Sequence, residues 1–145
     1  MGSGVRADVE IKLHNYVESQ IGIPFEFGVH DCPLFVLGAV DIICKTERRK
    51  EFEGKWHDQK SAWRYAKKNG DIYQHLENWG FKRVDIQFIQ TGDIIIMAQD
   101  MAHAKRWRSV AVCMGTKIAI VTTDKGVEMH KIRDVPNITG VVRWQ

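Results

Sequence analysis

One cysteine of the sequence lies where a thiol can become reactive. Cys32 follows His30 and Asp31 and starts an apolar run that reads as a buried helix, because it is apolar on every side. Asp31 is a suitable N-cap, and Pro33 is tolerated only in the first helical turn. A helix N-terminus favours the thiolate through its free N–H groups and its dipole. Cys32 is therefore a candidate nucleophile, with a buried small side chain as the alternative. Asp31 is read either as a cap or as a group that positions Cys32.

The elements expected to position Cys32 are helices in the first half of the chain and strands in the second. Apolar residues at helical spacing, capping residues and stop signals predict four helices. Short segments rich in Val and Ile, separated by turn signals, predict six strands. This order is typical of an α+β domain with an antiparallel meander. The expected helices are 5–20, 32–44, 58–69 and 71–79, and the expected strands are 81–84, 93–98, 109–114, 117–123, 127–131 and 139–144.

Length and composition fit one globular domain over residues 1–145. Met1 to Gly4 resemble vector-derived residues and are left out of the fold. No apolar run is long enough to span a bilayer, and the N-terminus lacks a secretory signal. Three cysteines without CxxC spacing favour reduced thiols, with Cys44 and Cys113 in the core. The histidines have no metal-ligand spacing, so neither a metal nor a cofactor is expected.

Positive charge is concentrated in one part of a chain whose net charge is +3. Lys45 to Lys68 holds nine Lys and Arg residues against four Asp and Glu residues. This pattern predicts either a surface for an anionic partner or the solvated side of helices. Trp107, between two arginines, is the candidate for a substrate or partner contact. Trp63 and Trp79 are expected in the core.

Several segments together resemble a known family. PFEFGVHDCPLFVLGAV is similar to the nucleophile segment of NlpC-type papain-like cysteine peptidases, and TGDIIIM, SVAVCMG and KIAIVTT resemble their later strands in order. The chain looks closest to a small phage-encoded branch of that superfamily. That branch carries FxWGxxDC, a segment like Phe52 to Trp56, a late Gly126-Val127 turn and a last strand like Val142 to Trp144. The resemblance covers residues 24 to 144.

The resemblance implies a papain-like fold, with Cys32 on a buried central helix followed by an antiparallel meander or half-barrel of five to six strands. It implies thiol acyl transfer, in which Cys32 attacks a carbonyl and a strand histidine takes its proton. The implied substrates are peptide or amide bonds of bacterial cell-wall peptides. It also implies a protein made in the host cytoplasm and carried in the virion, at the tail or neck, with other virion proteins as partners and a symmetric oligomer as the assembly.

The sequence departs from the family pattern at the residue that would act as general base. Ser109 occupies the family's histidine position, and serine cannot act as a general base at neutral pH. The next strand offers only Thr122 or Thr123 as the orienting group. His103, upstream of Ser109, is a candidate displaced base, and His130 is a second. His30, with Asp31, is a candidate for shaping the site.

Three hypotheses follow from these observations. The first is a catalytically degenerate virion protein that keeps the peptidase fold. The second is an active thiol peptidase or amidase (a hydrolase) of peptidoglycan that uses Cys32. The third is a small basic module that binds nucleic acid or protein, although no nucleic-acid-reading motif supports a nucleic-acid partner.

Overall fold

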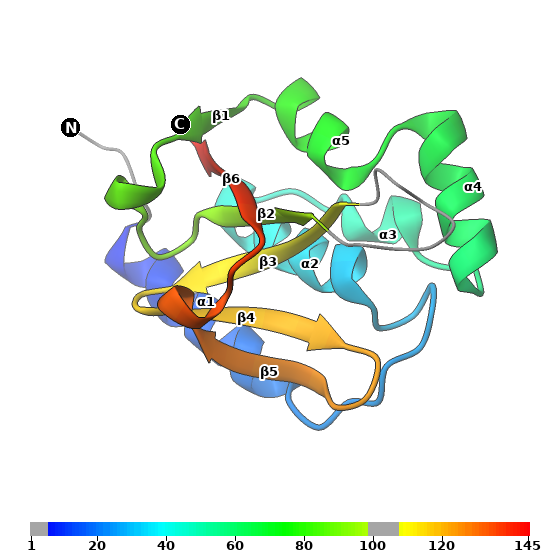
Figure 1. Ribbon diagram of the computed structural model, residues 1–145, viewed down its shortest axis with the longest axis horizontal. Coiled ribbons are helices and arrows are strands. Elements are labelled where there is room, and N and C mark those ends of the chain that lie inside the picture. The colour runs from blue at the N-terminus through cyan, green and yellow to red at the C-terminus, as the bar shows by residue number, and fades with distance from the viewer. Residues whose placement is uncertain (1–5, 99–107) are drawn as a thin grey trace.

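The computed structural model describes residues 6–98 and 108–145, and it confirms a mixed α+β fold with the helices first (Figure 1). All four predicted helices and all six predicted strands are present, each within two residues of the expected bounds. The sequence pattern missed three short elements, one α-helical and two 3-10. The elements are α1 (Ala7–Gln20), α2 (Cys32–Cys44), α3 (Arg49–Phe52), α4 (Gln59–Asn69), α5 (Ile72–Asn78), β1 (Phe81–Val84), η1 (Ile86–Phe88), β2 (Ile94–Ala98), β3 (Arg108–Met114), β4 (Lys117–Thr122), β5 (Gly126–Lys131), η2 (Ile132–Asp134) and β6 (Ile138–Trp144).

Side-chain caps start the helices that form the walls of the site. Asp58 and Asp71 each close a capping box with the residue three positions later, at α4 and α5 respectively. Asp31 caps α2 by accepting the N–H of Leu34 at 3.1 Å. The helix starts predicted from these aspartates are therefore confirmed.

The sheet is antiparallel throughout, with the strand order β1-β6-β2-β3-β4-β5. Only β2 to β5 form the predicted meander, because β6 returns and inserts between β1 and β2 (Figure 1). The burial of β6 explains this position. Val141 and Val142 are both buried although they point to opposite faces, which is typical of an inner strand.

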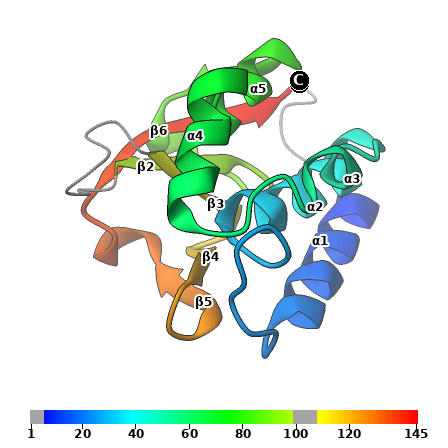
Figure 2. The ribbon, with the colours of Figure 1, turned by 90° about the vertical axis from the view of Figure 1, so that its right-hand side faces the viewer.

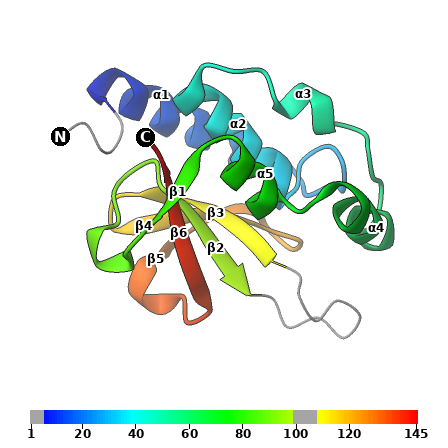
Figure 3. The ribbon, with the colours of Figure 1, turned by 90° about the horizontal axis from the view of Figure 1, so that it is seen from above.

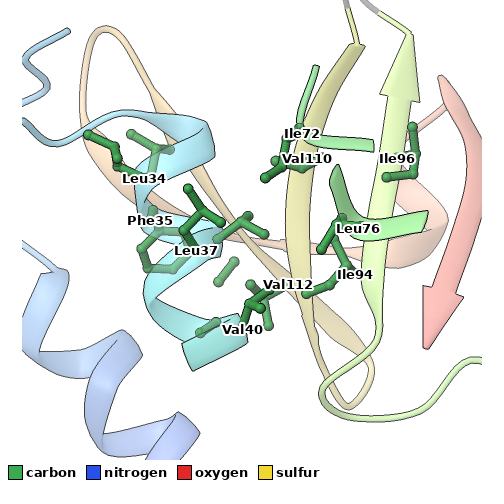
Figure 4. Packing of buried hydrophobic residues seen from close by; sticks show 14 of the residues in the cluster. Leu34, Phe35, Leu37, Val40, Ile72, Leu76, Ile94, Ile96, Val110 and Val112 are labelled. Carbon is green, nitrogen blue, oxygen red and sulfur yellow. The ribbon is translucent and has the colours of Figure 1, made fainter. Parts of the chain in front are cut away.

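The main core lies between the helices and one face of the sheet. Figures 2 and 3 show α1, α2 and α3 grouped on that side of the sheet. Leu37 of α2 is fully buried and faces Val110 and Val112 of β3, and Leu76 reaches the same layer from α5 (Figure 4). Phe35, on the other side of α2, is also fully buried and stacks on Tyr16 of α1. This packing makes α2 the central helix and fixes its N-terminus against β3.

The opposite face of the sheet has a smaller apolar cluster. Ala111, Cys113 and Ile118 are fully buried there, and Ile132 and Val135 pack on them from the connection between β5 and β6. Cys113 is therefore a core residue, as predicted, and Cys44 at the end of α2 packs against the main cluster.

A buried ion pair fastens the last strand to the sheet. Arg143 of β6 donates from Nε and Nη2 to the two oxygens of Asp93, both at 2.8 Å, and Nη2 also donates to the Phe88 carbonyl. Both side chains are less than a tenth exposed. Hydrogen bonding to Asp93 raises the pKa of Arg143, which keeps the guanidinium charged. Two segments of the family resemblance, TGDIIIM and the last strand from Val142 to Trp144, therefore meet in one structural contact.

Candidate functional site

The segment before α2 is folded around the carboxylate of Asp31. Besides capping α2, Asp31 accepts the backbone N–H of Gly28 at 2.9 Å and the indole N–H of Trp56 at 2.7 Å. Asp31 is 2% exposed, so these donors take the place of water around a buried carboxylate. The structure supports the reading of Asp31 as a cap, and it adds the bond to Trp56, which sequence reasoning missed.

Gly28 joins the same two segments through the backbone. It has a φ of +77°, and its carbonyl accepts the N–H of Gly54 at 2.9 Å. A Cβ at Gly28 would overlap the carbonyl oxygen of Trp56. The turn before Cys32 and the segment 52–56 therefore form one unit, which explains why both appear together in the resemblance.

Cys32 is the first residue of α2 and is partly exposed in a cleft. Its Sγ donates to the carbonyl oxygen of Val110 at 3.1 Å and accepts the Val110 N–H at 3.2 Å. Burial raises the pKa of the Cys32 thiol to about 12; the Val110 hydrogen bond opposes this, and the charge of Asp31 adds to it. The expected depressed pKa is therefore wrong, because desolvation of the thiolate outweighs the helix N-terminus.

Two of the three candidate histidines belong to the described residues, and neither of these two is hydrogen-bonded to Cys32. His30 is 2% exposed, and its Nε2 has no hydrogen-bond partner among the described residues. His130 bonds Glu128 through Nε2 at 2.9 Å, and Glu128 in turn accepts the hydroxyl of Thr122 at 3.0 Å. His130 is thus hydrogen-bonded to a neighbour on its own strand, β5. His103 and Trp107 lie outside the described residues.

Ser109 is at the cleft, but its strand directs it away from α2. It is 5% exposed and pairs with Met97 across β2 and β3. Side chains alternate along a strand, so Ser109 shares the face of Ala111 and Cys113, while Val110 faces α2. Among the described residues, the hydrogen bonds from β3 to Cys32 therefore come from the backbone of Val110 and not from Ser109, which stands at the family's histidine position.

A cleft of about 1260 Å³ opens beside Cys32. Figure 3 shows α4, the start of α2 and the adjoining ends of β2 and β3 on the same side of the molecule. Aromatic side chains from three segments supply much of the lining. They are Phe25, Phe27, Phe52, Trp56, Trp63 and Tyr65.

Helical spacing predicts two of the tryptophans, Trp63 and Trp79, in the core. Trp79 is half-buried and packs against the main cluster. The prediction for Trp63 is wrong, because Trp63 is 38% exposed and lines the cleft. Spacing assigns residues to one helix face but does not say whether a core or a cleft lies beside that face.

The lowered pKa of His30 predicts that the protein loses stability in acid. Burial and the nearby Arg49 lower its pKa below 6.5, although Asp31 opposes the shift. The unfolded chain then binds the proton more readily, so stability falls as the pH drops below about 6.5. Urea unfolding at pH 7.5 and 5.5 should show a smaller acid loss for His30→Gln than for the wild type. The exposed control His57→Gln should behave as the wild type, and equal losses in all three would contradict this role for His30.

Residues 5–138 match the family described as domain of unknown function DUF6950. The match spans nearly the whole chain, so the protein is a mixed α+β domain that belongs to this family. No curated protein matches the chain. Within the described residues, no helix is long and apolar enough to cross a membrane, and no three His, Cys, Asp or Glu side chains are grouped to hold a metal ion.

Proposed function

We propose that this chain is a phage virion-associated protein of the tail or neck, with an NlpC-type papain-like fold whose cleft binds a ligand without cleaving it. The support for the fold is the order of elements: a buried central helix with cysteine first, followed by antiparallel strands that pack on it. The support for the virion role is the resemblance of residues 24 to 144 to the phage branch. Other virion proteins, in a symmetric assembly, are then its partners.

The bonding of Cys32 is the observation that favours binding over catalysis. A cysteine nucleophile needs a thiolate and a base that takes the proton. The Cys32 thiol is instead bonded to both backbone groups of Val110, and its pKa is raised to about 12. At neutral pH such a thiol is almost entirely protonated. A missing general base alone commonly removes about 10²–10⁴-fold in rate.

Hydrolysis of cell-wall peptides tests this proposal. Purified protein incubated with a peptidoglycan digest should release no new amino groups or peptide fragments above background. Cys32→Ala should behave as the wild type, and Cys44→Ala serves as a control for loss of a thiol elsewhere.

Fragments that appear with the wild type and with Cys44→Ala, but not with Cys32→Ala, would contradict the proposal. That result would assign the active peptidase or amidase with Cys32 as its nucleophile.

A further inference from the structure

The cleft beside Cys32 has one aromatic wall that ends in a basic rim. Trp63 and Lys67 both line it from α4, one helical turn apart, and the Lys67 ammonium lies 5.2 Å from the centre of the Trp63 ring. Trp63 is 38% exposed, so a large apolar surface is open at the mouth of the cleft. Such a surface is suited to an apolar or aromatic side chain of a ligand.

All the charged residues of helix α4 are positive. Between Gln59 and Asn69 it has four exposed cations and no aspartate or glutamate. Three of them, Lys60, Arg64 and Lys68, each follow by one position the cleft-lining residues Gln59, Trp63 and Lys67. A shift of one residue is about 100° around a helix, so these cations lie beside the cleft-lining stripe. An acidic group bound next to Trp63 would meet several of them.

Among the described lining residues, Lys67 is the only lysine or arginine. The sheet side presents Ser109, Thr122, Thr123 and Thr139, which are neutral. On the helix side, Asp31 is bonded to Gly28, Leu34 and Trp56, as described above. In the part of the cleft that the structure describes, the lysine and arginine side chains therefore all belong to α4. A nucleic acid strand needs cations spread along the path of its backbone as well as aromatic side chains on which its bases stack. The described lining offers the aromatic side chains but has its cations on one wall, so the geometry favours a peptide.

The dimensions fit a short extended peptide. Eleven residues of α4, at 1.5 Å each, make a wall of about 16 Å. An extended chain rises about 3.3 Å per residue, so about five residues lie along this wall.

We infer that the cleft binds an extended peptide segment with a bulky apolar side chain flanked by acidic residues. The apolar side chain lies against Trp63 and the aromatic wall, and the acidic groups face the cations of α4. This ligand class rests on the proposed function, because it assigns the partner of the same cleft. It does not depend on Cys32 being inert.

Fluorescence anisotropy with labelled pentapeptides tests the inference. The probe is Ser-Glu-Phe-Glu-Ser with both ends blocked, and the comparison peptides replace both Glu by Lys, or Phe by Ala. The acidic aromatic probe should bind at least about tenfold more tightly than either comparison peptide. Its affinity should fall as salt rises, since the charges on α4 are exposed.

Variants of cleft residues test whether the probe binds in the cleft. Trp63→Ala and Lys67→Glu should each weaken probe binding by about fivefold or more, and Arg133→Glu, an exposed charge reversal outside the cleft lining, should leave it unchanged. Absent binding, equal binding of the lysine peptide, or preference for a single-stranded DNA oligomer would overturn the inference.

Binding of the probe and its cleavage by Cys32 are measured separately, because they test different claims. Cys32→Ala should bind the probe as the wild type does. If the wild type cleaves the probe, the proposed function fails while the ligand class stands, whereas a protein that neither binds nor cleaves the probe overturns the ligand class alone.

Discussion

Gly28→Ala is expected to destabilise the protein by about 4 kcal/mol or more, which would leave little of the native state at 37 °C. Two independent causes add. The φ of +77° costs an L-residue about 1–2 kcal/mol, and the new Cβ overlaps the carbonyl oxygen of Trp56, a backbone atom that cannot rotate away. Relief of the overlap would pull Gly28 away from Gly54 and Asp31, its two hydrogen-bond partners.

Gly54→Ala is the matched control for this prediction. Gly54 has a similar φ of +73°, but nothing lies within 4 Å of the position its Cβ would take. It should therefore show only the backbone cost, about 1–2 kcal/mol. Urea unfolding of the two variants separates the overlap from the strain. Equal losses in both would contradict the contact between Gly28 and Trp56.

Arg143→Met is expected to cost about 3–5 kcal/mol of stability, because it leaves the carboxylate of Asp93 buried without its cation. Arg143 makes two bonds to Asp93 and one to the Phe88 carbonyl, all at 2.8 Å, and all three are lost together. The pair joins β6 to the start of β2, so its loss also loosens the strand that closes the sheet.

A double-mutant cycle checks the origin of that loss. Asp93→Leu with Arg143→Met should be at least about 2 kcal/mol more stable than the sum of the two single losses predicts, because no unpaired charge then remains. Arg83→Met, at a more exposed arginine on β1, is the matched control and should cost far less. Losses below about 1 kcal/mol in both single variants, or strictly additive losses, would contradict a tightly coupled buried pair.

The local elements could be predicted because their signals are local. Asp58 and Asp71 mark helix starts by capping, and runs such as residues 94–98 mark strands by composition and flanking turns. The position of β6 depends on pairing with residues about fifty positions away in sequence, so no local signal fixes it.

The site was predictable in its position but not in its chemistry. Cys32 lies at a helix start, as its neighbours indicate, yet its pKa is raised by burial in the folded chain, and its hydrogen-bond partner Val110 lies 78 positions away. The helix N-terminus favours a thiolate only where the sulfur remains solvated enough to ionise. Trp63 shows the same limit, because its spacing fits a core until the cleft beside α4 is known.

The rate of alkylation of Cys32 by iodoacetamide, mapped by mass spectrometry from pH 6 to 9, tests the central claim most directly. A thiol with a pKa of about 12 is roughly a thousandfold less ionised at pH 8 than an ordinary thiol with a pKa near 8.5. Cys32 should therefore react far more slowly than N-acetylcysteine throughout this range, and at the same rate as N-acetylcysteine once the protein is unfolded in urea. Rapid modification of Cys32 in the folded protein at pH 6 would show a stabilised thiolate and contradict the account.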